Sequence, residues 1–146
     1  MENFKFSLQK LLDIRIDKEE ESKINFKKAQ QEKVTAEQNL EKLNNNYKKF
    51  SEERKYGSIV QQKITQAYLS SLSGCIDRAS MELNNKTSVL EQKRRELKDT
   101  QIERKTVEIL RDKQKDKFIK EQNRIEQKTN DEFALYGFIR RNSEGR

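Results

Sequence analysis

Apolar residues recur at alternating spacings of four and three along the first fifty residues of this chain. Nine of the thirteen positions in this repeat are apolar, about twice the hydrophobic fraction of 32% in the whole sequence. A 3.5-residue period that persists for six heptads is typical of a coiled-coil strand and differs from the wider apolar face of a globular helix. The repeat falls on Leu8, Leu12, Arg15, Glu19, Ser22, Phe26, Ala29, Lys33, Ala36, Leu40, Leu43, Tyr47 and Phe50.

A second apolar frame runs through the other half of the chain and predicts a second long helix. Seven of its ten positions are apolar. Val107, Ile109 and Leu110 lie between its two arginines, which predicts a local rotation of the apolar stripe of the kind that a stutter produces. The frame falls on Ile76, Leu83, Leu90, Leu97, Arg104, Arg111, Phe118, Ile125, Glu132 and Ile139.

Residues that break helices are rare in this sequence. The 146 residues contain no proline and only four glycines, at positions 57, 74, 137 and 145. Disordered segments are usually enriched in both residue types, so helix is the better interpretation of so polar a chain. Because 39% of the residues are charged, a large three-dimensional core is excluded, and the helices must bury a narrow seam instead.

We therefore predict an all-α fold in which two long helices form an antiparallel coiled-coil hairpin, as a single coiled-coil domain over residues 1–146. The expected parts are a first helix at about 5–51, a reversal at about 52–60, a second helix at about 60–139 and a basic tail at 140–146. A kink or second break near 70–75 is expected to keep the second helix from overhanging the first. The two termini would then meet at one end of the hairpin.

The sequence offers little for catalysis, because it has no histidine, no tryptophan and one cysteine, Cys75. Most nucleophile–base pairs and transition-metal sites are thereby removed, and no phosphate-binding glycine loop, HExxH, CxxC or EF-hand motif occurs. We expect no enzyme, no catalytic residue, no metal and no cofactor, with Cys75 as a small seam residue. The start lacks a signal-peptide core, and no apolar run is long enough for a membrane span, which indicates a cytosolic protein without direct membrane insertion.

The net charge of +7 raises the question of nucleic-acid binding. The 32 basic and 25 acidic residues are interleaved, however, and the densest basic spot, Lys93–Arg95, lies between Glu91 and Glu96. Acid-first pairs four residues apart, such as Glu82 and Lys86, support a solvated helix. A charged outer face is therefore the preferred interpretation, and no nucleic-acid partner is expected.

Large apolar residues gather in three places that a two-helix seam does not explain. The first is the opening "FKFSLQKLLDIR", whose alternation at Phe4, Phe6 and Leu8 does not fit a helical seam. Near the reversal lie Tyr47, Phe50, Tyr56, Tyr68 and Leu72, which either dock a partner or pack on each other to close the hairpin. Towards the other terminus apolar residues return at Phe133, Leu135, Tyr136, Phe138 and Ile139.

Two of these segments resemble the flagellar type III export protein FliJ family. The opening is similar to that family's F-x-F-x-L-x-x-L-L-x-x-R start, and "EQKTNDEFAL", Glu126 to Leu135, is similar to its C-terminal E-x-K-x-x-D-E-F/x-A segment. The resemblance implies an antiparallel coiled coil shaped like the gamma stalk of rotary ATPases. It also implies three partners: the hexameric flagellar export ATPase, the cytoplasmic domain of the export gate FlhA, and export chaperones.

The resemblance further implies which residues meet these partners. The end with the two termini would enter the ATPase ring, with the candidates Phe4, Phe6, Leu8, Leu11, Leu12, Arg15, Asp131, Glu132, Phe133, Arg140 and Arg141. The surface facing the export gate would consist of Leu43, Tyr47, Phe50, Tyr68 and Leu72. The implied location is the cytoplasm, at the inner face of the cell membrane where the export apparatus stands.

Three alternatives remain open from sequence. The equivalent stalk of a virulence type III secretion system would share the fold. A basic coiled coil that binds nucleic acid or an anionic membrane surface would lose affinity steeply with salt. A generic dimerising scaffold would pair its heptads between chains instead of within one hairpin.

Overall fold

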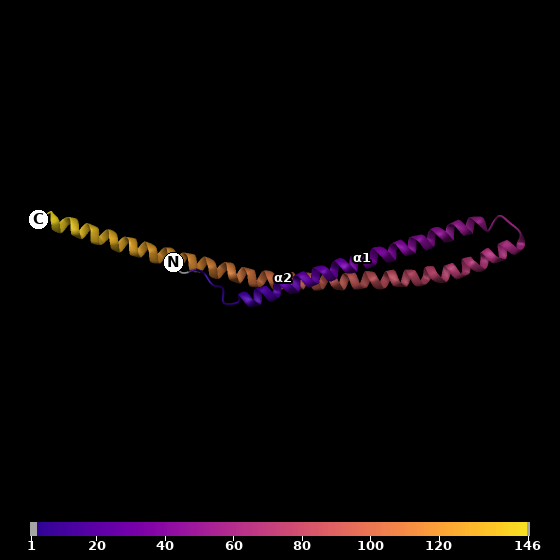
Figure 1. Ribbon diagram of the computed structural model, residues 1–146, viewed down its shortest axis with the longest axis horizontal. Coiled ribbons are helices and arrows are strands. Elements are labelled where there is room, and N and C mark those ends of the chain that lie inside the picture. The colour runs from indigo at the N-terminus through magenta and orange to yellow at the C-terminus, as the bar shows by residue number, and fades with distance from the viewer. Residues whose placement is uncertain (1–2, 146) are drawn as a thin grey trace. The chain divides into compact units, whose positions relative to one another are not determined.

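Two helices make up the computed structural model of the protein, which describes residues 3–145. Helix α1 spans Gln9–Glu53 and helix α2 spans Ile59–Glu144, and no strand occurs within those described residues. The two helices pack against each other as a helical hairpin (Figure 1). The predicted all-α hairpin is confirmed.

The chain divides into two compact units. The hairpin unit comprises Asp17–Gln101 and contains the reversal between the helices. The terminal unit combines the described residues up to Ile16 with those from Ile102 onward. The expectation of one coiled-coil domain stays a prediction.

The seam of the hairpin unit follows the heptad frames expected from sequence. On α1 the buried or half-buried residues include Phe26, Ala29, Ala36, Leu40 and Leu43. On α2 the less exposed residues recur at spacings of four and three, which is the seam of a coiled coil. They are Thr65, Leu69, Leu72, Ile76, Ala79, Leu83, Lys86, Leu90, Lys93, Leu97 and Thr100.

The reversal is fixed by local geometry around Gly57. This glycine has a φ of 114°, which side-chain-bearing residues rarely adopt. Ser58 and Gln61 form a capping box at the start of α2: the Ser58 backbone N–H donates to Gln61 Oε1, and the Gln61 backbone N–H donates to Ser58 Oγ. Arg54 also donates a hydrogen bond to Gln66 Oε1, which ties the end of α1 to the start of α2.

The second break expected near 70–75 is absent, because α2 is one continuous helix through Ser70–Gly74. An interior glycine costs a helix only about 1 kcal/mol relative to alanine. Leu69, Leu72 and Ala79 are buried on either side of Gly74 in the seam. Their burial outweighs that cost, and the helix continues.

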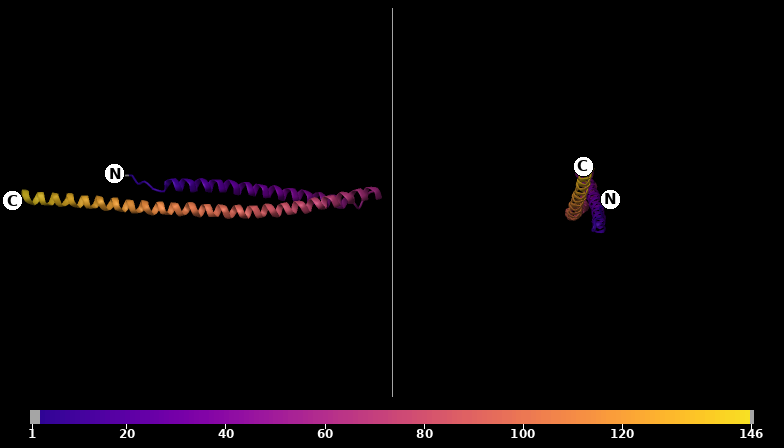
Figure 2. Two further views of the ribbon diagram at one scale, coloured as in Figure 1. Left: turned by 90° about the horizontal axis from the view of Figure 1, so that it is seen from below. Right: turned by 90° about the vertical axis from the view of Figure 1, so that its left-hand side faces the viewer.

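In the terminal unit, residues 3–8 precede the first helix and lie against α2 (Figure 2). Phe6, Leu12 and Val107 form a buried cluster, with Phe4 and Leu11 packed against it. The seam of α2 continues without a shift through Arg104, Val107, Arg111, Gln114 and Phe118, all buried or half-buried. The expected stutter is therefore wrong, because the long aliphatic stems of arginines can cover a seam while their charged ends reach solvent.

Beyond Phe118, α2 continues as an overhang, which we define as residues 119–144. It covers about 39 Å at the rise of an α-helix. Nearly all of its residues are exposed; only Gln122 and Gly137 are half-buried. The helix ends at Glu144, so residues 140–144, expected as a basic tail, are helical.

The expected meeting of the apolar groups from the two termini does not occur in the terminal unit. The N-terminal residues reach α2 at Phe118, where Phe4 and Phe118 have ring centroids 5.7 Å apart. The apolar residues 133–139 lie more than a dozen positions further along the same helix and are exposed. The reason is the unbroken α2, which has 86 residues against 45 in α1 and therefore outruns it.

Two glycine substitutions test this account of the turn and the unbroken helix. Gly57→Ala should lower the free energy of unfolding by about 1–3 kcal/mol, because φ is positive and a Cβ would lie 2.6 Å from Gln61 Oε1. Gly74→Ala should raise it by about 0.5–1 kcal/mol, since no atom lies within 4 Å of an added Cβ. Urea unfolding followed by circular dichroism at 222 nm measures both, and a destabilising Gly74→Ala would show that α2 is not continuous there.

Candidate interaction surfaces

The N-terminal candidates for ATPase binding are largely engaged within the terminal unit. Leu12 is 0% exposed, and Phe6 is also buried. Arg15 forms an ion pair with Glu103, at 2.5 Å between Nη1 and Oε2. Leu8 is the most accessible member of this group. These side chains close the start of α1 onto α2, so only a part of this set is free to meet a partner.

The overhang presents the opposite situation. Phe133 is 71% exposed, and Leu135, Tyr136, Phe138 and Ile139 are also exposed. Successive residues of an α-helix are rotated by about 100°, so these five side chains project around most of the helix circumference. A helix that is apolar all round is normally enclosed on all sides. The remaining candidates on this side, Asp131, Glu132, Arg140 and Arg141, are exposed on the same segment.

The residues predicted to face the export gate take part in the packing of the hairpin unit. The rings of Phe50 and Tyr68 meet edge to face, with centroids 4.9 Å apart. Leu72 is 6% exposed, and Leu43 is half-buried. Tyr47 and Tyr68 keep part of their surface in solvent. Packing that closes the hairpin is therefore displayed by Phe50, Tyr68 and Leu72, whereas Tyr56 is 80% exposed. Gate binding by the predicted residues stays a prediction.

A further exposed apolar group lies at the reversal. Of its members, the sequence singled out only Tyr56, and it assigned Ile59, Val60 and Ile64 to no site. Tyr56 is 80% exposed and Ile59 is 73% exposed, and Val60 and Ile64 are exposed as well. We call these four residues the outer tip face. They lie off the seam frame that runs through Thr65, Leu69 and Leu72. That departure from the frame was the signal in the sequence that could have identified them.

Polar groups in the seam are paired. Lys86 Nζ lies 3.2 Å from Glu32 Oε2 across the hairpin unit, and Lys33 Nζ lies 3.8 Å from Glu37 Oε1. Glu19 is buried, with Lys23 Nζ 3.6 Å away. Within the described residues no buried side-chain nitrogen or oxygen lacks a hydrogen-bond partner. Such polar contacts fix the register of a coiled coil.

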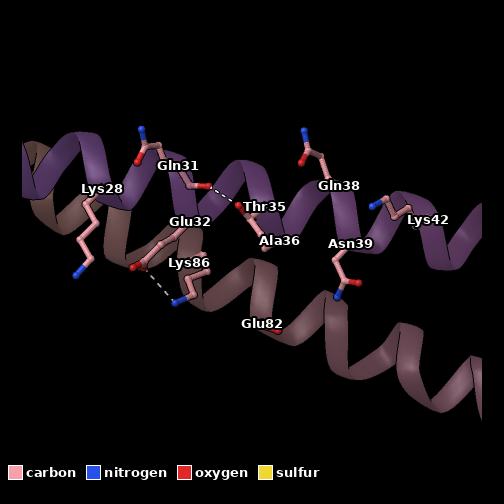
Figure 3. A pocket seen from close by; sticks show the side chains of 10 residues that line it. All are labelled: Lys28, Gln31, Glu32, Thr35, Ala36, Gln38, Asn39, Lys42, Glu82 and Lys86. Atoms are coloured by element: carbon pink, nitrogen blue, oxygen red, sulfur yellow. Dashed lines mark hydrogen bonds and ion pairs between the residues drawn. The ribbon is translucent and has the colours of Figure 1, made fainter.

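The groove around Ala36 illustrates how little of this surface suits a small ligand (Figure 3). Its walls carry side chains of Lys28, Glu32, Asn39, Lys42 and Lys86, with the Glu32–Lys86 ion pair along it. It is open and polar, whereas small-molecule sites are usually concave and mostly apolar. Over residues 3–145 there is no group of three or more acidic, cysteine or histidine side chains able to hold a metal ion.

Ion pairs on the outer surface are local. In the overhang, the hydrogen bond from Arg124 lowers the pKa of the Glu121 carboxyl, and the same contact raises the pKa of Arg124. In α1, Glu20 accepts a hydrogen bond from Lys23 and raises the pKa of that amine. All three groups are solvent-exposed and serve as surface charge, not as acid–base chemistry.

Comparisons with known proteins identify one family. The family described as "Flagellar FliJ protein" matches residues 4–143, nearly the whole chain. No curated protein and no solved structure matches. None of the helical residues described forms a segment long and apolar enough to cross a membrane.

The different burial of the candidates predicts different effects of truncation. Leu12→Ala should lower the free energy of unfolding by about 2–5 kcal/mol, because it empties the centre of the buried cluster. Phe133→Ala, at an exposed position, should change it by less than about 0.5 kcal/mol. Thermal or urea unfolding of both variants measures this, and a strongly destabilising Phe133→Ala would mean that the overhang packs on another part of the chain.

Proposed function

The chain belongs to the FliJ family and is thus a component of the flagellar export apparatus, and we propose that it is a stalk that binds the hexameric export ATPase through its overhang. In this role it promotes assembly of the ATPase ring and raises its activity, without catalysis of its own. The observation that carries the proposal is the exposed apolar segment 133–139, whose side chains project from most sides of the helix.

The apolar side chains of such a helix are all buried only by a partner that encloses the helix. Burying a large apolar side chain is worth roughly 1.5–3 kcal/mol, and five such side chains lie within seven residues here. A flat protein surface covers one side of a helix and leaves the others in water. The central opening of a ring covers every side, so a hexameric partner matches the distribution of Phe133, Tyr136 and Phe138.

The charged candidates and the N-terminal cluster have supporting roles in this proposal. Asp131, Glu132, Arg140 and Arg141 flank the apolar residues and would set the orientation of the helix within the ring. Phe4, Phe6, Leu11, Leu12 and Arg15 position the start of α1 on α2, and Leu8 is the member of that group most available for direct contact.

We also propose that the protein contacts the cytoplasmic domain of the export gate FlhA and escorts export chaperones. This part follows from family membership, and exposed apolar side chains near the reversal support it. The protein would then act in the cytoplasm, at the inner face of the cell membrane.

The alternatives receive less support. The matching family is a flagellar one, which favours the flagellar apparatus over a virulence secretion system. The apolar heptad positions of the hairpin unit are buried by packing within one chain, which argues against a scaffold that dimerises through them. Many basic side chains are held in ion pairs, such as Arg94 with Glu91 and Arg124 with Glu121, which argues against a basic nucleic-acid or anionic-surface binder.

Hydrolysis by the cognate export ATPase, with ring assembly followed by light scattering, tests the proposal. The wild-type chain should stimulate both. A Phe133→Ser/Tyr136→Ser variant should need at least about tenfold more protein for half-maximal stimulation, because about 1.4 kcal/mol of lost binding is a factor of ten. Both residues are exposed, so the fold should be unaffected.

The matched control is Ile102→Ser/Ile109→Ser, which removes two exposed aliphatic side chains from the same helix outside the overhang. It should stimulate like the wild type. Equal loss of stimulation in both variants would contradict a specific role for the overhang. Absence of stimulation by the wild-type chain would remove the ATPase-stalk function altogether.

A further inference from the structure

The outer tip face differs from the residues that the family resemblance implies for gate binding. Leu72 is buried, and Phe50 packs its ring on Tyr68 within the hairpin unit. Tyr56, Ile59, Val60 and Ile64 are far more accessible and take no part in that seam. A large exposed apolar patch at one end of an element marks an interaction site more often than chance.

The turn holds this face in a defined shape. The positive φ of Gly57, the Ser58–Gln61 capping box and the Arg54–Gln66 hydrogen bond fix the residues on both sides of Tyr56. A side chain presented from a rigid turn loses little conformational entropy on binding. The outer tip face is thus preorganised for a partner.

The charged residues that neighbour the face in the sequence indicate the partner's chemistry, and we call the basic ones among them the basic rim. Seven charged residues lie between positions 44 and 76, and five of them are basic, which gives a net charge of +3. They are Lys48, Lys49, Glu52, Glu53, Arg54, Lys55 and Lys63. An apolar centre with a basic rim is complementary to an apolar patch with an acidic rim.

The form of the face favours a protein over a lipid bilayer. A hollow at the tip is lined by Glu53, Tyr56, Gly57, Gln61, Ile64 and Thr65. A protruding side chain of a protein fills such a hollow, whereas a fluid bilayer surface offers no fixed knob.

We propose that the outer tip face is the docking surface for an acidic, apolar patch on a partner protein. The inference rests on the proposed function for the choice of probe, the cytoplasmic domain of the cognate export gate. Tyr56, Ile59, Val60 and Ile64 then make the contact, while Phe50 and Leu72 serve the packing of the hairpin unit.

Binding of the full-length chain to the immobilised gate domain tests the proposal. Ile59→Ser/Ile64→Ser should raise the Kd at least about thirtyfold, as central apolar contacts do in protein interfaces. Its thermal unfolding should match the wild type, since both side chains are exposed. The control Met81→Ser, at another exposed position of the hairpin unit, should bind normally.

The basic rim has its own test. Lys55→Glu/Lys63→Glu should weaken binding about tenfold or more at low salt, and less at high salt, because rim charges act through a screened field. A Kd that is unchanged in both the rim variant and Ile59→Ser/Ile64→Ser, with wild-type binding intact, would overturn the inference and leave gate binding standing.

Two other outcomes are informative. If the wild-type chain does not bind the gate domain, the gate-binding part of the proposed function fails and this inference fails with it, while ATPase stimulation is judged separately. Vesicles of one part phosphatidylglycerol to three parts phosphatidylcholine are the lipid probe. Sedimentation of the wild-type chain with them, abolished by Ile59→Ser/Ile64→Ser, would assign the face to lipid and overturn the inference.

Discussion

The narrow seam between α1 and α2 determines what every other part of this protein can do. Three of its buried residues are the alanines Ala29, Ala36 and Ala79, so the seam buries little apolar surface per turn. Ion pairs such as Glu32–Lys86 in the hairpin unit and Arg15–Glu103 in the terminal unit help to fix the register of the helices. Because the seam side chains are buried in the folded chain, binding to a partner depends on residues outside the seam.

The separation of folding residues from binding residues follows from the unequal lengths of the two helices. Helix α1 and the residues before it cover α2 as far as Phe118, where Phe4 closes the terminal cluster. The rest of α2 keeps an intact backbone without a neighbour, because an α-helix satisfies its own hydrogen bonds. Exposed apolar residues on such a segment cost solubility, and in the proposed function the ATPase ring would enclose them.

Heptad spacing predicted the hairpin, the α1 frame and the α2 frame as far as Phe118, because burial in a coiled coil repeats with the sequence period. The last three positions of the α2 frame, Ile125, Glu132 and Ile139, are exposed, because they lie in the overhang. The prediction of a second break near residues 70–75 was wrong. Ser70–Gly74 has the composition of a helix break, yet the burial of the leucines beside Gly74 outweighs the cost of one glycine in a helix. The expected meeting of the two termini depended on that break and failed with it. The Ser58–Gln61 capping box is a recognisable sequence pattern and is consistent with the start of α2 at Ile59. Tyr56 and Ile59 lie off the seam frame, which the sequence already indicates, but the exposed fractions of their side chains follow only from the placed helices.

Amide hydrogen exchange of the full chain, alone and with the cognate ATPase hexamer, shows whether the overhang is free in the isolated chain and enclosed by the ATPase. Amides that lack tertiary packing open and exchange sooner than those beside a buried seam. In the isolated chain, residues 119–144 should exchange faster than the helix around Leu90. Addition of the hexamer should slow exchange in 119–144 and leave 59–68 unchanged. Protection confined to 59–68, with none in 119–144, would contradict the account, because the ATPase would then bind the reversal and not the overhang.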